Sequence, residues 1–180
     1  MTKEVNIHWF RNDLRLDDNP SLTKATKNSE LIPIYIFDEN ATVDFNHGEA
    51  SLTWLYESLK LLNKSLENRL LIFKGDPLKI LKDLKNNNNV SGVYWNRNYA
   101  PWEIKRDTII KQDIKKTGIE CETFNGNLLW EPWEILKKDG TPYKVFTPFY
   151  RKGCLGSSPP RVPLPKPPKI NLKQNIVKNN

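Results

Sequence analysis

The sequence predicts an α/β protein with a five-stranded, mostly parallel, doubly wound sheet of the Rossmann-like type and helices on both faces. Five short segments rich in β-branched and aromatic residues are distributed over the first 124 residues, with stretches long enough for helices between them. Several of these segments are apolar for four or more residues without clean alternation, which is typical of strands buried on both faces. Such strands in alternation with helices favour a parallel sheet covered on both sides.

The predicted strands account for most of the apolar runs in this part of the chain. They are Val5–Phe10, Leu31–Phe37, Leu70–Lys74, Gly92–Trp95 and Ile119–Phe124. The first of them leads directly into a segment that packs arginines and aspartates together before Pro20. Such a segment after a strand indicates either a solvated turn or a loop that holds something in place.

The first two predicted helices carry different signals. Asn19 followed by Pro20 is an N-cap with proline at the first helical position, so we expect a short helix to about Asn28. From about Gly48, leucines recur at steps of three and four residues and form an apolar stripe on one helix face. The stripe consists of Leu52, Leu55, Leu59, Leu62 and Leu66.

The remaining two predicted helices both begin at a proline. Asp76–Pro77 repeats the signal of a cap followed by proline and precedes a helix over Leu78–Lys85. Pro101 opens a helix that we expect to end at about Lys116. Each helix lies between two predicted strands, as a parallel sheet requires.

The sequence changes character after residue 124. Residues 125–150 hold turn signals (NGN, DG, TP) and aromatic residues but no long periodic segment, so they are expected to form an ordered crossover. Residues 157–168, SSPPRVPLPKPP, contain six prolines and exclude a helix or a central strand. We therefore expect a domain over residues 1–124, the crossover over 125–150, and a proline-rich basic linker over 151–180.

The positive charge of the chain belongs to its last thirty residues. Seven of the 28 Lys and Arg residues lie in 151–180, which has no acidic residue, and the other 21 balance the 21 Asp and Glu residues of 1–150. The net charge of +7 is therefore no sign that the folded body binds nucleic acid. A proline-rich charged segment of this kind favours a solvated connector over a DNA contact.

The composition excludes several classes of protein. No apolar run approaches the roughly 18 residues of a membrane span, and the N-terminus lacks the apolar region of a signal peptide. Cys121 and Cys154 form no CxxC pair, which predicts reduced thiols in a cytoplasmic protein, with Cys121 as a small buried hydrophobic residue. A monomer is expected.

Sequence motifs for catalysis and metal binding are absent. The chain has no GxGxxG after the first strand, no GxxxxGK[ST], no GxSxG and no HExxH. His8 and His47 do not have the spacing of metal ligands, and both are interpreted as structural histidines. The residues themselves thus predict neither a catalytic group nor a metal site, and they favour a domain that holds a ligand or organises a larger protein.

Three motifs resemble those of one known family. WFRNDLRLDDNPSL, which starts at Trp9, closely resembles the N-terminal signature of the DNA photolyase/cryptochrome family. WNRNYAPWEIKRD (Trp95–Asp107) is similar to the family's segment after the fourth strand. NLLWEPWEI (Asn127–Ile135), followed by GTPYKVFTPFYRK (Gly140–Lys152), resembles the crossover between the family's two domains.

The resemblance implies the N-terminal light-harvesting α/β half of a cyclobutane pyrimidine dimer photolyase. In that family a larger helical domain follows the linker, binds FAD and repairs damaged DNA by light-driven electron transfer. That domain is absent from this chain and is its expected partner, so the full-length parent would be a carbon–carbon lyase, while this fragment alone would be inactive. The alternatives are a cryptochrome-type blue-light photoreceptor domain and a stand-alone α/β module that binds a nucleotide or a partner.

The resemblance also implies a bound antenna chromophore. It is methenyltetrahydrofolate in some members and an 8-hydroxy-5-deazaflavin in others. Glu103 stands where the folate-binding pattern has an acid, whereas Leu52 and Asn98 replace the Arg and Asp of the deazaflavin pattern, so folate is favoured. Trp102 replaces the asparagine of some folate binders. The candidate chromophore-binding residues are Phe37, Asp38, Asn98, Trp102 and Glu103.

The remaining candidate residues are expected to have structural roles. The resemblance implies that the charged loop after the first strand stabilises the boundary between the two halves. Its residues in that role are Arg11, Asp13, Arg15 and Asp17. Residues of the crossover are expected to pack against the absent half, and they are Trp130, Trp133, Phe146 and Phe149. Three other tryptophans fall in predicted strands or on a predicted helix, and core packing is expected for Trp9, Trp54 and Trp95.

Overall fold

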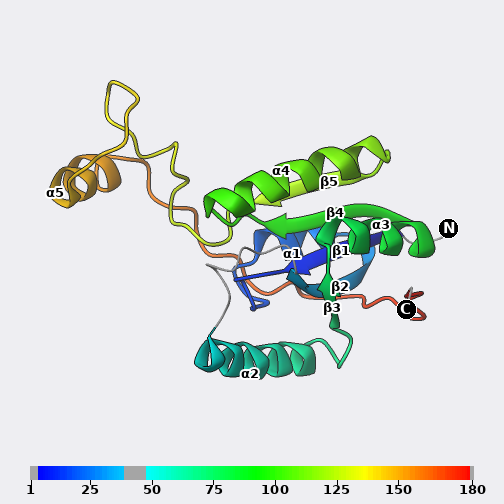
Figure 1. Cartoon of the computed structure of the whole chain (residues 1–180). Helices are drawn as coiled ribbons and strands as arrows, with labels where there is room; N and C mark the ends of the chain where they lie inside the picture. The colour runs from blue at the N-terminus through cyan, green and yellow to red at the C-terminus, as the bar shows by residue number, and fades with distance from the viewer. Residues whose placement is uncertain (1–3, 39–47, 179–180) are drawn as a thin grey trace.

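A computed structural model describes residues 4–38 and 48–178 and has a single five-stranded sheet as its centre (Figure 1). The strands are β1 (Glu4–Phe10), β2 (Ser29–Asp38), β3 (Leu71–Gly75), β4 (Val90–Asn96) and β5 (Glu120–Phe124). They lie in the order β3-β2-β1-β4-β5, and every adjacent pair is parallel. The predicted doubly wound α/β fold is thus confirmed, and each strand lies within two residues of its predicted bounds.

Four helices cover the sheet. They are α1 (Pro20–Ala25), α2 (Glu49–Ser65), α3 (Pro77–Asn88) and α4 (Pro101–Lys116). The side chain of Asn19 caps α1 and that of Asp76 caps α3, each followed by proline as predicted. α1 ends three residues earlier than predicted, because the Thr26 hydroxyl bonds to the Leu22 carbonyl and Asn28 adopts a left-handed conformation. In the described part of the chain, no helix is both long and apolar enough to cross a membrane.

The sheet carries one hydrophobic core on each face. On one face the indoles of Trp9 and Trp95 pack at 5.7 Å between ring centroids, beneath side chains of α3 and α4. The other face is covered by α1 and α2, and its buried residues include Leu22, Leu59, Leu62, Leu66 and Tyr94. Since strands β1 and β4 are buried on both faces, their carboxyl ends are held in fixed positions.

Trp54 does not pack in a core, contrary to the prediction, because its side chain is 80% exposed. Trp9 and Trp95 are buried as predicted, and so are the last three leucines of the α2 stripe. A helix turns by about 100° per residue, so the side chain of Trp54 points about 100° away from that of its neighbour Leu55 in the leucine stripe. Trp54 therefore lies outside the buried face of α2. Cys121 is buried as expected, and burial raises the pKa of its thiol to about 12.

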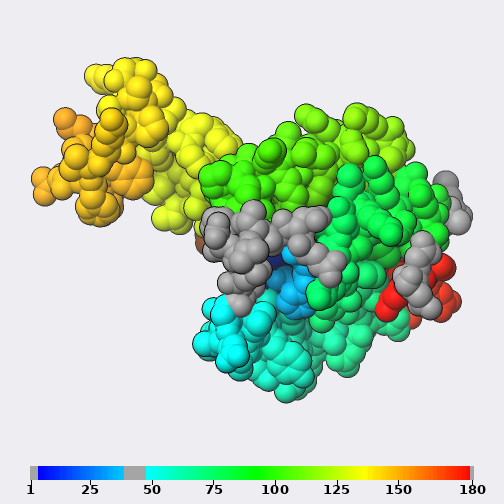
Figure 2. All heavy atoms as spheres, viewed as in Figure 1, coloured from blue at the N-terminus to red at the C-terminus, as the bar shows by residue number. Residues whose placement is uncertain are grey.

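Residues 125–158 form an arm that leaves the body after β5 (yellow to orange in Figures 1 and 2). The arm contains two short helices, α5 (Phe146–Pro148) and η2 (Phe149–Cys154). It has a small core of its own, in which Gly153 packs so closely that an added Cβ would lie 2.7 Å from Ile135. The predicted crossover, residues 125–150, lies within this arm.

The chain then returns to the body along residues 164–177, which we call the C-terminal strap. Leu31 of β2 donates to the Asn171 carbonyl at 2.7 Å and accepts from the Lys173 amide at 2.9 Å. Leu172 packs on the core beneath α1 and α2, and Ile176 on the core beneath α3 and α4. The segment predicted as a linker therefore includes a part that packs against the folded body.

The buried side chain of Asn88 holds the end of the strap. It donates to the Val177 carbonyl and accepts from the Val177 amide, both at 2.9 Å. Asn88→Ala should lower the free energy of unfolding by about 1–3 kcal/mol, because these hydrogen bonds are lost at a buried site. Urea denaturation will measure this change, and hydrogen exchange should show faster exchange of the Lys173 and Val177 amides.

Asn86→Ala is the matched control for this prediction, because Asn86 is an exposed residue of the same helix. Its free energy of unfolding should stay within about 0.5 kcal/mol of the wild type. Equal losses in the two variants would show that Asn88 does not hold the strap.

Candidate functional site

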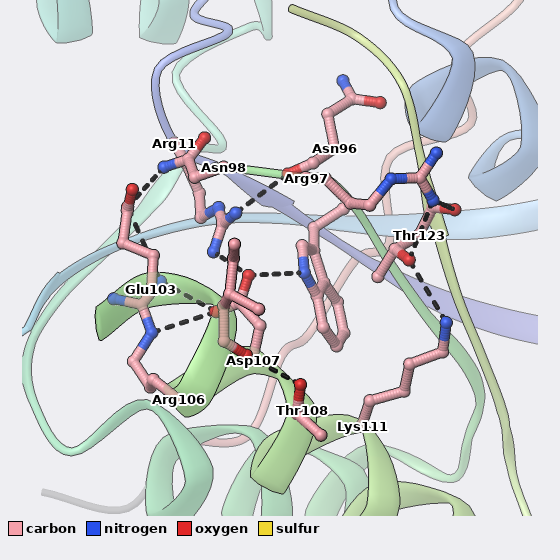
Figure 3. A network of polar contacts seen from close by, with 12 residues as sticks. Arg11, Asn96, Arg97, Asn98, Glu103, Arg106, Asp107, Thr108, Lys111 and Thr123 are labelled. Carbon is pink, nitrogen blue, oxygen red and sulfur yellow. Dashed lines mark hydrogen bonds and ion pairs between the residues drawn. The ribbon is translucent and has the colours of Figure 1, made fainter. Parts of the chain in front are cut away.

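The carboxyl ends of β1 and β4 meet at a buried cluster of charged side chains (Figure 3). Arg11, in the loop after β1, donates to Asp107 Oδ2 at 2.6 Å and to the Asn96 carbonyl at 3.0 Å. Burial lowers the pKa of Arg11, while the adjacent Asp107 carboxylate acts in the opposite direction. A guanidinium keeps its charge in proteins, so Asp107 balances a buried positive charge.

Asp107 also accepts hydrogen bonds from two other donors. Arg106, its neighbour on α4, bonds to Oδ1 through Nε at 3.0 Å and through Nη2 at 2.9 Å. The indole Nε1 of Trp95 donates to Oδ2 at 3.3 Å. Both carboxylate oxygens are therefore occupied by protein donors, and this side chain joins β4, α4 and the loop after β1.

Arg106 connects the cluster to the end of β2. Its Nη1 donates to Asp38 Oδ2 at 2.8 Å, and its guanidinium lies 5.2 Å from the ring centroid of Trp9 and 4.9 Å from that of Trp102. Burial alone would lower the pKa of Arg106, but Asp107 and Asp38 outweigh that effect, so the pKa is raised. Two of the predicted chromophore-binding residues, Asp38 and Trp102, thus surround one guanidinium.

Glu103 lies in the first turn of α4, close to the same cluster (Figure 3). Its Oε1 accepts from Asn98 Nδ2 at 2.5 Å and lies 3.8 Å from Arg106 Nη2. The side chain is 13% exposed. Glu103 and Asn98 are therefore in direct contact, whereas Phe37 packs against Tyr35 at 5.0 Å on the α1 and α2 side of the sheet.

A second network fixes the loop after β1. Asp13 accepts from the Arg11 amide at 2.8 Å through one oxygen and from Asn96 Nδ2 at 2.5 Å through the other. Asn96 Nδ2 also donates at 2.8 Å to the side chain of Asn19, which caps α1. Asp13 is buried and connects this loop to the end of β4 and to the start of α1.

The outer part of the loop contacts both ends of the arm. Arg15 donates to the carbonyls of Asp18 and Gly126, the second of which lies at the start of the arm. Asp17 is exposed, and its neighbour Asp18 forms the ion pair with Arg161, where the chain returns from the arm. The hydrogen bond from Arg161 holds the pKa of Asp18 below its ordinary value.

A hollow of about 640 Å³ opens between the loop after β1 and the start of α2. Its walls combine aromatic rings and polar groups, and the lining includes Arg11, Asn12, Tyr35, Ser51, Trp54 and Ser58. Burial raises the pKa of Tyr35 to about 12, so its hydroxyl is neutral. Ligand sites in proteins have this size and this mixture of surfaces.

The predicted aromatic contacts of the crossover all lie on the arm. Trp133 is 60% exposed and Phe146 73% exposed, and Phe149 is also exposed. Trp130 is half-buried and donates from Nε1 to the Ser158 carbonyl at 2.8 Å, which ties the start of the arm to its end. These residues are separate from the charged cluster, except that Trp133 lies over Arg97 at 5.8 Å.

The histidines and acidic residues of the described chain form no metal site, since residues 4–38 and 48–178 hold no suitable group of three ligands. His8 lies in β1, fully buried, with Nε2 2.7 Å from the Ser21 hydroxyl. Burial lowers its pKa to about 4, which keeps the ring neutral at pH 7. His8 is thus a buried structural histidine, but only Nε2 is hydrogen-bonded, since Nδ1 has no partner among the described residues. His47 lies outside the described residues.

Comparison with known proteins identifies the family. The family model described as DNA photolyase matches residues 6–169. The chain belongs to the DNA photolyase family. A deoxyribodipyrimidine photo-lyase of Agrobacterium fabrum is 40% identical over 96% of this chain, and cryptochrome-2 of Arabidopsis thaliana is 34% identical over 89% of it.

A solved member of the photolyase family has the same fold. The crystal structure of a class III photolyase from Agrobacterium tumefaciens matches with a TM-score of 0.91 and 35% identity over the whole of this chain. The chain spans 37% of that structure, and 37% and 27% of the two curated relatives. The membership predicted from the motifs is therefore confirmed.

Several residues of the charged cluster were not predicted as functional. Asn96, Arg106 and Asp107 all lie within the WNRNYAPWEIKRD motif that identified the photolyase family, and Asp18 lies in the first motif. An available signal was the pairing of charged residues with the ends of apolar strands. Partners far apart in sequence, such as Arg11 and Asp107, have no local pattern that would reveal their contact.

The buried His8 predicts a dependence of stability on pH. Its pKa is about 4 in the folded state and about 6.5 in an unfolded chain, so protonation favours unfolding. The stability that neutral His8 supports is complete above pH 6.5 and falls by about 3 kcal/mol as the pH drops from 6.5 to 4. Urea denaturation at a series of pH values will measure this loss.

The variant His8→Gln keeps a polar group beside Ser21 and does not titrate in this range. Its free energy of unfolding should therefore fall less steeply than that of the wild type between pH 6.5 and 4. Identical slopes for the two proteins would show that His8 is not the group responsible.

Proposed function

We propose that this chain is the light-harvesting half of a photolyase and holds an antenna chromophore at the carboxyl ends of its strands. The observation that carries the proposal is the 640 Å³ hollow beside Arg11, at the edge of the sheet where open α/β proteins bind ligands. The similarity to a deoxyribodipyrimidine photo-lyase supports a parent enzyme that repairs cyclobutane pyrimidine dimers in DNA, with FAD in its other half.

The residues of the hollow fit a flat conjugated ring. Trp54 offers an exposed indole face at the rim and Tyr35 a second aromatic ring, so a ring system can stack there. Hydroxyl groups of Ser51 and Ser58 and the buried cation of Arg11 supply polar contacts to its edges. Methenyltetrahydrofolate is the proposed ligand, with an 8-hydroxy-5-deazaflavin as the alternative. When bound, the chromophore would absorb light and pass the excitation energy to the flavin.

Glu103 is the second proposed contact for the chromophore. One of its oxygens accepts from Asn98, and a carboxylate can accept further N–H donors, such as those of a pterin ring. Glu103 is not among the residues that line the hollow, and the Arg11, Asp107 and Arg106 cluster lies close to both. Variants at the hollow and at Glu103 therefore test two separate contacts.

A cryptochrome-type photoreceptor is the second candidate for the parent. Cryptochrome-2 of Arabidopsis thaliana is 34% identical over 89% of this chain, so the α/β half is similar in both groups. Repair of dimer-containing DNA under blue light by the full-length parent would favour a photolyase. Light absorption by the flavin without repair would favour a cryptochrome.

Folate binding can be measured on this chain by fluorescence titration with methenyltetrahydrofolate. Trp54→Ala should weaken binding about fivefold to a hundredfold, because stacking on an aromatic side chain contributes about 1–3 kcal/mol. Glu103→Gln should also weaken folate binding, because the charged acceptor is lost. Glu57→Gln, at an exposed position of the same helix as Trp54, is the control and should bind as the wild type does.

The outcomes of this titration separate the two contacts. Unchanged affinity in Trp54→Ala would contradict the placement of the ring in the hollow. Unchanged affinity in Glu103→Gln, together with a loss in Trp54→Ala, would remove Glu103 from the site.

We further propose that the arm is the docking surface for a C-terminal helical half. The arm carries several exposed apolar side chains, and five of them are called the arm patch: Trp133, Val145, Phe146, Phe149 and Tyr150. The rings of Phe146 and Tyr150 are stacked at 5.8 Å. Apolar groups gathered in this way mark interaction surfaces, and the relatives of this chain are more than twice its length.

The arm patch makes a testable prediction for the isolated chain. Trp133→Ser with Phe146→Ser should lower the fluorescence of a bound hydrophobic dye at least twofold, because these are the two most exposed aromatic side chains of the patch. The double variant Leu61→Ser with Ile109→Ser, on exposed positions of α2 and α4, is the matched control. A larger loss of dye binding in this control would contradict the assignment of the arm as the main apolar surface.

A further inference from the structure

One ion pair joins the start of the arm to the sheet. Arg97, the first residue after β4, donates to Glu131 Oε1 from Nε at 3.0 Å and also from Nη2. Its third nitrogen, Nη1, donates to the Thr123 carbonyl of β5 at 2.6 Å (Figure 3). A single planar guanidinium thus connects β4, β5 and the arm.

Glu131 is the arm's side of this contact and is almost fully buried. Its side chain is 7% exposed, and its second oxygen accepts from the Tyr99 hydroxyl at 2.8 Å. Burial, together with this hydrogen bond to Glu131, raises the pKa of Tyr99 to about 12, so the hydroxyl keeps the proton that it donates. Both oxygens of Glu131 therefore bind side chains of the body.

The geometry of the pair restricts rotation as well as distance. Nε and Nη2 of one rigid guanidinium bind the same oxygen of Glu131, and Tyr99 binds the other, so three donors hold the carboxylate where a lysine would supply a single ammonium. The Arg97 backbone is itself held, because its amide donates to the Phe124 carbonyl at 2.8 Å. Within the arm, the Glu131 amide donates to the side chain of Glu134 at 2.5 Å, so the carboxylate cannot move without the backbone turn that carries it.

Other contacts hold the first residues of the arm. Gly126 packs against Asn96 so closely that an added Cβ would overlap that side chain, and its carbonyl accepts from Arg15. These contacts lie only two residues beyond the end of β5. Glu131 lies five residues further along the arm.

We propose that Arg97 and Glu131 are positioning residues, and that their ion pair fixes the direction in which the arm leaves the sheet. The pair thereby fixes where the arm patch is presented relative to the carboxyl ends of the strands. Its importance for docking rests on the proposed function of the arm, but the positioning itself is a property of this chain and is tested without a partner.

The test is a distance measurement between the body and the arm by pulsed electron paramagnetic resonance. Spin labels are attached at Lys116→Cys, a highly exposed position at the end of α4, and at Lys138→Cys, an exposed position on the arm. The native residues Cys121 and Cys154 are buried and are not expected to take label. The wild-type pair should give one narrow distance distribution.

Glu131→Gln should broaden this distribution at least twofold, because the amide removes the negative charge that Arg97 faces and replaces the oxygen that accepts from the Tyr99 hydroxyl with an NH2 donor. Arg97→Lys should broaden it as well, since lysine has no fork of donors. Glu57→Gln is the control: its exposed carboxylate pairs with Lys60 at 3.5 Å on α2, and the same chemical change there should leave the distribution unchanged.

Two results would overturn the proposal. One is a distribution in Glu131→Gln as narrow as in the wild type. The other is unfolding of the whole chain, seen as lost hydrogen-exchange protection in β1 and β4, which would show that the pair supports the body instead of directing the arm. Failure of a helical half to dock would count against the arm patch alone and would leave the positioning result unaffected.

Discussion

The carboxylate of Asp107 faces two guanidinium groups and an indole N–H in a place that water hardly reaches, and the surrounding elements depend on that contact. Removal of one partner from a buried ion pair commonly costs about 3–5 kcal/mol, because a charge is left without compensation. Here the loss of one carboxylate would leave both Arg11 and Arg106 without it. The loop after β1, the start of α4 and the end of β2 all take their positions from these three side chains.

The residues at the end of β4 connect this cluster to three other parts of the molecule. Asn96, Arg97 and Asn98 follow one another in sequence, and their side chains contact the loop after β1, the arm and the first turn of α4 respectively. Parallel strands end at the same edge of a sheet, so three consecutive residues can serve three partners there. The proposed chromophore site and the proposed docking arm are therefore supported by one short stretch of backbone.

Local patterns in the sequence predicted the elements well and their long-range contacts poorly. The caps at Asn19 and Asp76 are short-range signals, and the helices begin where these residues indicate. Trp54 was assigned to the core because it falls on a predicted helix, but its side chain lies outside the buried face of that helix. Asp38, Trp102 and Glu103 were named from the family motif, while Arg106, which contacts all three, was not. The pairing of Glu131 with Arg97 spans 34 residues, and no local pattern encodes it.

The strap changes the order in which this chain can fold during its synthesis. Leu172 and Ile176 pack against the two cores, yet they follow the proline-rich segment and the whole arm. The sheet can pair once β5 has left the ribosome, but the contacts of Leu172 and Ile176 wait until some fifty further residues have been added, a delay of several seconds at about 5–20 residues per second. The arm is thus an insertion within one folding unit. A nascent chain paused in the proline-rich segment would leave exposed the apolar surface that Leu172 and Ile176 later cover, and a chaperone could protect that surface during the pause.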